Sequence, residues 1–299
     1  MSIIYREWRN TMMKRVLIDN LIGGEILARE ISDQNGVQLL SAGTVYKESY
    51  SKTLSNLKID YLDIQKDEDD FDCDLLRKQS RKLVQSQLKR FNKVGSINIY
   101  KFEKFVYMIM NELMESIHIM KNMYTIQDYN NYTYEHSVRV TAIAIMICNK
   151  LNLARYKTYE IAMGCMLHDL GKTKVPERIL NKPGRLTEEE FDEIKKHPED
   201  GYYYIKNNKN LSIIIQEIIL THHEKLDGSG YPLGLGEKDI CTGSRICAVA
   251  DVFDAMCSER PYKKAMSLPE SMRIMKTTMN KQLDMTICTV LEDILNSTT

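Results

Sequence analysis

Histidines and aspartates are the residues of this chain whose types and spacing are best suited to chemistry. His168 is followed at once by Asp169, and His222 and His223 are adjacent. Asp251 lies in an apolar segment, where a buried carboxylate without a partner would be costly. Taken singly, each side chain could be an ordinary buried or surface group. Taken together, they predict a metal site.

The candidate ligands recur at intervals of about 30 residues, each long enough for one helix and one loop. A helical bundle could therefore present one or two ligands per helix to a common centre. The set contains no cysteine, which suits two ions of Fe, Mn, Zn or Ni. A carboxylate shared by two ions is typical of sites that attack phosphate esters, and Asp169 is the best candidate for it. The full set is His136, His168, Asp169, His197, His222, His223 and Asp251.

Several segments together resemble the HD-GYP family of cyclic di-GMP phosphodiesterases. The two most specific are "HDLGK" at 168–172 and "HHEKLDGSGYP" at 222–232. The similarity continues across residues 130–270, in the same order and spacing. The further segments are "YEHSVRV" (134–140), "VPERILNKPGRLTEEEFDEIKKHPEDG" (175–201) and "RICAVADVFDAMCSERPYKKA" (245–265).

The resemblance implies how the seven ligands are shared between two ions. One ion would lie among His136, His168, Asp169 and Asp251. The other would lie among Asp169, His197, His222 and His223.

The resemblance also assigns roles outside the ligand set. Lys172 corresponds to a lysine that assists catalysis and binds substrate, and Arg260 and Lys263 correspond to positions that contact substrate phosphates. Asp254, one helical turn after Asp251, is expected to support a metal ligand. Tyr132 replaces a glutamate that helps some members to hold a third ion. Because phenol is a poor ligand at neutral pH, the sequence predicts a site of two ions rather than three.

The implied reaction is hydrolysis of cyclic di-GMP to linear pGpG, GMP or both. A hydroxide held between the two ions would attack the phosphorus, with Fe or Mn favoured over Zn or Ni. The sequence does not separate cyclic di-GMP from cyclic GMP-AMP. Two alternatives stay open: another nucleotide phosphohydrolase of the HD superfamily, and a non-catalytic module that binds cyclic dinucleotides.

The glycine-rich stretch after His223 is predicted to form the substrate side of the site. Gly228 and Gly230 would let the chain turn tightly and approach a ligand. Tyr231 and Pro232 would supply a flat, stiff wall for a base or ribose. His222 and His223 can reach one ion only if the helix that precedes them ends or distorts there.

The elements that must position these residues are helical from residue 98 onward. Apolar residues at helical spacing predict an amphipathic helix with a buried face: Phe102, Phe105, Ile109, Leu113, Ile117 and Met120. His118 lies on the same helix without a ligand-type neighbour, so a structural role is expected. The stretches 187–190 ("TEEE") and 267–270 ("SLPE") each predict a capping box at a helix start.

A mainly α fold with three parts is expected. Residues 1–66 would form a small α+β domain, possessing a hairpin turn at Asn35–Gly36 and then a helix and a strand within residues 50–64. Residues 67–97 would form a charged linker helix, acidic at its start and basic later. Residues 98–299 would form the catalytic HD-GYP bundle.

Composition limits the partners. The 41 basic and 41 acidic residues give no net charge, so no general attraction to DNA, RNA or an anionic membrane is expected. No apolar run approaches the length of about 18 residues that spans a bilayer. The seven cysteines form no CxxC pair and predict buried thiols in a reducing cytoplasm. A homodimer or a regulatory partner could use the N-terminal domain or the linker.

Overall fold

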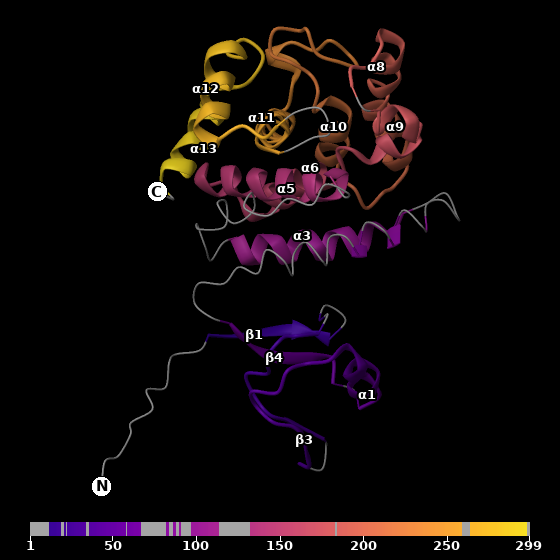
Figure 1. Cartoon of the computed structure of the whole chain (residues 1–299), viewed down its shortest axis with the longest axis vertical. Coiled ribbons are helices and arrows are strands. Elements are labelled where there is room, and N and C mark those ends of the chain that lie inside the picture. The colour runs from indigo at the N-terminus through magenta and orange to yellow at the C-terminus, as the bar shows by residue number, and fades with distance from the viewer. Residues whose placement is uncertain are drawn as a thin grey trace. The chain divides into compact units, whose positions relative to one another are not determined.

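The computed structural model divides the chain into two compact units, Met1–Asp72 and Cys73–Thr299 (Figure 1). Among the described residues, none of the helices combines the length and the apolar character that crossing a bilayer requires. The described residues are 12–66 except 19, 20, 22, 34, 35 and 58; 82, 83, 86, 87 and 90; 97–113; 132–258 except 183; and 264–297.

The N-terminal unit is a small α+β structure, as predicted. Strand β1 (Met12–Leu17) pairs antiparallel with β4 (Tyr61–Lys66), and β2 (Ile31–Ser32) pairs antiparallel with β3 (Gln38–Leu40). Between β3 and β4 in the sequence lie the 3-10 turn η2 (Glu48–Tyr50) and helix α1 (Ser51–Asn56). The core of the unit is formed by Ile18, Leu21, Leu27, Ile31, Tyr46, Leu54 and Leu62.

Two local predictions for this unit are confirmed. The β2–β3 hairpin turns at Gly36, whose φ of +79° is a conformation that glycine adopts without strain. Its predicted neighbour Asn35 lies outside the described residues. The order of helix α1 and strand β4 is also as predicted.

The second unit is helical, and its described residues contain no β-strand. Its elements are α3 (Ile99–Leu113), α5 (Tyr132–Lys150), α6 (Arg155–Leu167), η4 (Leu170–Lys174), α7 (Glu177–Leu180), α8 (Glu188–Ile194), α9 (His197–Ile205), α10 (Ile213–Thr221), η5 (Glu237–Asp239), α11 (Thr242–Cys257), α12 (Leu268–Thr278) and α13 (Met285–Ser297).

Helix α5 is the centre of this bundle. Residues 135–148 are all buried, which is typical of a helix enclosed by others rather than of a surface helix. It packs against α3, α6, α11 and α13 (Figure 1). Polar side chains within α5 are therefore held at fixed positions inside the protein.

Helix α3 confirms the predicted amphipathic stripe over its described part. Phe102, Phe105, Ile109 and Leu113 are buried. The rest of the predicted stripe, Ile117 and Met120, lies outside the described residues, as does His118.

The two predicted helix starts have different outcomes. At α8 the Thr187 side chain accepts a hydrogen bond from the Glu190 amide, and the Glu190 carboxylate accepts one from the Thr187 amide. The capping box is therefore confirmed. At α12 the Ser267 hydroxyl accepts from the Glu270 amide. There the Glu270 carboxylate pairs instead with Arg273, 2.7 Å away.

The predicted linker helix is described at few positions. Residues 82, 83, 86, 87 and 90 are helical, and most of 67–97 lies outside the described residues. The domain limits at 66 and 97 therefore stay a prediction.

Candidate metal centre

Five structural elements bring the seven candidate ligands together. His136 comes from α5, and Asp251 from α11. His168 and Asp169 follow α6, while His222 and His223 follow α10, which ends at Thr221 as their shared role requires. His197 is the first residue of α9.

A glycine contact fixes the distance between two of these elements. Gly171 in η4 lies so close to α9 that a Cβ atom at residue 171 would be 1.9 Å from the carbonyl oxygen of His197. Glycine therefore permits the segment after Asp169 to lie directly against the helix that begins with His197.

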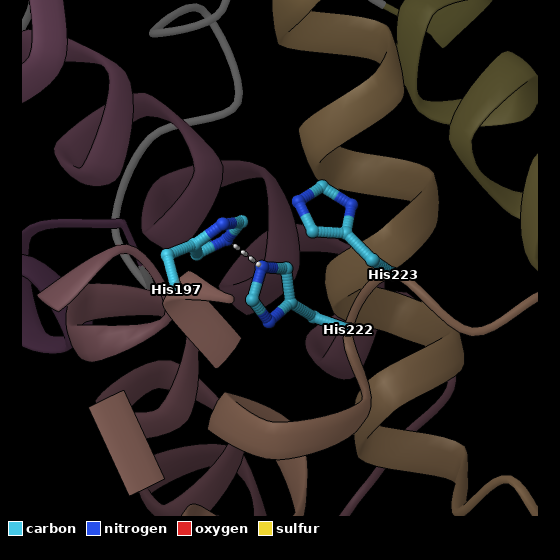
Figure 2. A group of neighbouring side chains, drawn as sticks. All are labelled: His197, His222 and His223. Carbon is cyan, nitrogen blue, oxygen red and sulfur yellow. Dashed lines mark hydrogen bonds between the residues drawn. The ribbon is translucent and has the colours of Figure 1, made fainter. Parts of the chain in front are cut away.

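The ligand atoms form three overlapping groups, in each of which they lie within 4.8 Å of one another. One group is His136, His168 and Asp251, and another is His197, His222 and His223 (Figure 2). The third group is His168, Asp169 and His222, and it shares His168 with the first group and His222 with the second. All seven predicted ligands therefore belong to these overlapping groups, and their assignment to two ions stays a prediction.

Three histidines are oriented by the backbone turn that precedes each of them. The Nδ1–H of His168 donates to the carbonyl oxygen of Cys165 at 2.6 Å. His197 and His222 donate in the same way to the carbonyl oxygens of Ile194 and Ile219, at 2.7 Å and 2.9 Å. Because a carbonyl only accepts, Nδ1 must carry the proton and Nε2 keeps its lone pair. Such a hydrogen bond is typical of histidines that bind metals.

The free ring nitrogens fit a cation. The Nε2 atoms of His197 and His222 are 3.2 Å apart, and in these tautomers both would direct lone pairs at each other (Figure 2). A proton between them is disfavoured, because burial lowers the pKa of His197 to about 3 and that of His222 well below its usual value. Among the described residues, His168 Nε2 and Asp169 Oδ1 are buried with no hydrogen-bond partner. Divalent ions bound among these atoms would give each of them a partner.

His136 is held by a carboxylate instead of a carbonyl. Its Nδ1 lies 2.7 Å from Asp254 Oδ2, and its Nε2 lies 3.1 Å from Asp251 Oδ1. Burial alone would lower the pKa of His136, but the two carboxylates raise it to about 9. The predicted supporting role of Asp254 agrees with this contact.

Arg139 completes the support of His136 and was missed in the sequence. Its Nε donates to Asp254 Oδ1 at 2.6 Å, and it also donates to Ser258 Oγ at 3.0 Å. Both Arg139 and Asp254 are buried, so their charges stabilise each other away from water. The only signal in the sequence is a charged residue three positions after His136 within a buried helix.

Asp169 lies between the two outer groups. Its Oδ2 is 3.5 Å from His168 Nε2 and 3.7 Å from His136 Nε2, and its Oδ1 is 3.5 Å from His197 Nε2. Lys172 Nζ lies 2.7 Å from Asp169 Oδ2. Burial alone would raise the pKa of Asp169, but His168 and Lys172 lower it well below its usual value. The carboxylate is therefore ionised and suited to bridge cations.

The predicted substrate-side residues Gly228, Gly230, Tyr231 and Pro232 lie in a longer loop, residues 225–236, which we call the glycine loop. Tyr231 lies against the ring of His223, with ring centroids 4.8 Å apart, so the loop meets the histidine group. Gly228 has a φ of +76°, which supports the predicted tight turn. At Gly230 the close approach is to the chain itself, since a Cβ atom there would be 2.4 Å from Glu224 Cα and Lys225 N.

Some predicted residues are not placed by the structure. Arg260 and Lys263 lie outside the described residues, and so does the side chain of Tyr132, although its backbone begins α5. Glu224 was missed in the sequence, although it stands directly between His223 and the glycine loop. It is buried, and its carboxylate accepts hydrogen bonds from three loop amides.

The metal-free protein is expected to lose stability as the pH falls from 6.5 toward 4. Burial lowers the pKa of His197 to about 3, that of His223 to about 4, and those of His168 and His222 below 6.5. The unfolded chain therefore binds more protons below pH 6.5, which favours unfolding. His136 has the opposite sign: its contribution is complete below pH 6.5 and is lost as the pH rises toward 9.

This pH dependence can be measured by thermal melting in the presence of a chelator. The melting temperature should be highest near pH 6.5 to 7 and should fall on the acid side. A melting temperature that rises between pH 6.5 and 4.5 would contradict the burial of neutral histidines.

Comparison with known families agrees with this geometry. The sequence profile of the HD domain family matches residues 120–287. A cyclic di-GMP phosphodiesterase of Pseudomonas aeruginosa is 42% identical over 146 residues, which are 49% of this chain and 35% of the relative. A cyclic di-GMP phosphodiesterase of Thermotoga maritima is 39% identical over 170 residues, 56% of this chain and 46% of the relative.

A third relative is specific for a different cyclic dinucleotide. It is a 3'3'-cGAMP-specific phosphodiesterase of Vibrio cholerae, 37% identical over 167 residues, which are 56% of this chain and 38% of the relative. The chain thus spans less than half of the length of each of these relatives.

A solved structure shares the fold. An HDG"Y"P protein of Bdellovibrio bacteriovorus superposes with a TM-score of 0.63 at 18% identity, covering 95% of this chain and 100% of that one. This chain, mainly helical with a small N-terminal strand region, therefore has the overall fold of the Bdellovibrio protein.

Proposed function

The chain belongs to the HD domain family, as its resemblance to HD-GYP proteins predicted, and on this basis we propose that it hydrolyses cyclic di-GMP with two divalent metal ions. The observation that carries the proposal is the buried group of histidine and aspartate ligand atoms within 4.8 Å of one another, in which His168 Nε2 and Asp169 Oδ1 have no hydrogen-bond partner. HD domains bind divalent metals, and the relatives named above hydrolyse cyclic dinucleotides.

The residues that would hold the metals follow the predicted division. One ion would be bound by His136, His168, Asp169 and Asp251, and the other by Asp169, His197, His222 and His223. When bound, the ions would supply Lewis-acid activation of water and of a phosphate group. We propose Fe or Mn before Zn or Ni, and two ions rather than three because Tyr132 replaces the glutamate of some members.

The protein's own groups would bind and orient the substrate. Lys172, 26% exposed and next to Asp169, is placed to donate to a phosphate oxygen or to the leaving 3′ oxygen. Tyr231 and Pro232 would pack against a base or ribose. Arg260 would grip a phosphate with two parallel hydrogen bonds, and Lys263 would act as a point charge.

The proposal also covers the products, the location and the partners of the protein. The products would be linear pGpG, GMP or both. We place the protein in the cytoplasm, which the free state of its six described cysteines supports. A second copy or a regulatory protein would bind the N-terminal domain (1–66) or the linker (67–97) next to the catalytic part (98–299).

Lys172→Ala is expected to slow hydrolysis by about 100-fold, within the range for loss of a positioned proton donor. It should keep its metal, because the ligand atoms stay in place. Steady-state kinetics and elemental analysis of the same sample measure both quantities. The control is Lys174→Ala, which removes an exposed lysine of the same 3-10 turn, where it pairs with Asp200 of α9. Loss of metal in Lys172→Ala would instead indicate a structural role.

Gly230→Ala is expected to reduce kcat/KM by up to about 100-fold, because a displacement of 1 Å at a site can have this effect. The added methyl group would collide with the backbone of Glu224 and Lys225, which cannot yield as a flexible side chain can. Gly236→Ala is the matched control in the same loop, since a Cβ atom there meets nothing within 4 Å. Equal activity of the two variants would contradict the role of the loop.

Product analysis with two substrates tests the proposed function. Metal-reconstituted protein is incubated with cyclic di-GMP or with 3'3'-cGAMP, and the products are separated chromatographically. Faster conversion of cyclic di-GMP supports the proposal. Faster conversion of 3'3'-cGAMP would instead indicate a preference for 3'3'-cGAMP, the specificity of the Vibrio cholerae relative. Binding without conversion of either would indicate a non-catalytic module.

A further inference from the structure

We infer that Glu224 is a positioning residue that holds the glycine loop against the histidine group, an inference that rests on the proposed function for its kinetic consequence. Glu224 is 4% exposed. Its Oε1 accepts from the amides of Leu233 and Gly234 at 2.6 Å and 3.1 Å, and its Oε2 accepts from Leu235 at 2.9 Å. One carboxylate therefore binds three successive amides on the far side of the loop.

The chain between Glu224 and these amides contains Tyr231. The Tyr231 amide donates to the carbonyl oxygen of His223 at 3.3 Å, and Gly230 lies directly on the backbone of Glu224 and Lys225. The loop tip thus folds back on the backbone of residues 223–225. We call the three hydrogen bonds that Glu224 accepts from residues 233–235 the clamp. Because Tyr231 also contacts the His223 ring, the clamp sets the position of Tyr231 relative to the metal ligands.

The base of the loop has separate anchors. The Leu226 amide donates to the carbonyl oxygen of Gln282, and the Glu237 amide donates to that of Leu226. Arg245 donates to the carbonyl oxygen of Ile240 and lies 3.2 Å from Asp284. Loss of the Glu224 carboxylate should therefore release the tip while the base and the bundle stay in place.

Only a carboxylate can accept from all three amide donors at residues 233–235. It has two oxygens with about four lone pairs, whereas a glutamine has one oxygen and an NH₂ group that would face a donor. A buried donor left without an acceptor is costly, so the tip should open in Glu224→Gln. Glu237→Gln removes the same charge from an exposed side chain at the end of the same loop and is the matched control.

The test combines hydrogen exchange with kinetics on the full chain. In Glu224→Gln, amide exchange at 233–235 should be at least about tenfold faster, while exchange in α5 and α11 and the bound metal stay unchanged. The KM for cyclic di-GMP should rise by about tenfold with kcat altered less than threefold, because the variant loses a substrate wall and no reacting group. Glu237→Gln should match the wild type in every measurement.

The outcomes separate the clamp from the proposed function. Unchanged exchange at 233–235 would overturn the clamp. Faster exchange with unchanged KM and kcat would overturn the positioning role, since a purely structural contact predicts that result. A wild type that converts no cyclic di-GMP would overturn the proposed function, and the exchange result alone would then decide on the clamp.

Discussion

Asp169→Ala is expected to abolish turnover of cyclic di-GMP and to release bound metal. Asp169 is the residue whose carboxylate oxygens lie within 3.7 Å of ring nitrogens from three different elements, those of His136, His168 and His197. Loss of a residue that merely supports a ligand lowers metal affinity or activity by about 10- to 100-fold, and loss of the bridging ligand should exceed this range.

The measurement pairs elemental analysis with turnover, and circular dichroism follows the fold. The helical content should stay near that of the wild type, because the side chain belongs to the site rather than to the apolar core. Asp192→Ala is the control, since Asp192 is 67% exposed and pairs only at the surface with Lys195. Normal turnover by Asp169→Ala would rule out the bridging assignment.

Asp254→Ala is expected to have the second largest effect, on stability as well as on metal binding. Its carboxylate orients His136 through Nδ1 and pairs with the Arg139 guanidinium, and all three groups are buried. Removal of one partner of a buried ion pair destabilises by about 3–5 kcal/mol. The affinity for metal should also fall by about 10- to 100-fold, because the His136 ring loses the group that fixes its tautomer.

Urea unfolding of the chelated protein and titration with Mn²⁺ measure these two effects separately. Asp254→Asn should retain more stability, since its amide oxygen can still accept from Arg139 Nε. Asp192→Ala again serves as the surface control. Wild-type stability of Asp254→Ala would show that the buried pair does not hold α5 to α11.

The clustering of the seven candidate ligands could be predicted from the sequence because it depends on residue type and spacing. The adjacent His168–Asp169 and His222–His223 pairs mark the site, and the structure brings all seven candidates into overlapping groups. The tautomers could not be predicted, because the acceptors for His168, His197 and His222 are backbone carbonyls fixed by the local turn.

The roles of Arg139 and Glu224 were missed because they depend on packing between distant segments. Arg139 and Asp254 are 115 positions apart, and a single sequence gives no sign that they meet. Glu224 acts on amides nine to eleven positions later, which lie close only after the loop has folded back. Gly230 was predicted to approach a ligand, whereas its close neighbours are Glu224 and Lys225.

Of the two predicted capping boxes, one forms completely and the other forms only in part. The Thr187 capping box forms because both of its hydrogen bonds lie within one turn. At Ser267 the same pattern gives half of the box, because Arg273 lies three residues after Glu270 and pairs with its carboxylate. A competing partner on the same helix face decides which bond forms.

A metal titration tests the central claim most directly. Chelated protein is prepared without oxygen, Mn²⁺ or Fe²⁺ is added in steps, and turnover of cyclic di-GMP is followed alongside bound metal. Two divalent ions sharing Asp169 predict that activity appears only as the second ion binds and saturates at about two ions per chain. Full activity at one ion per chain, or activity that survives chelation, would contradict the account.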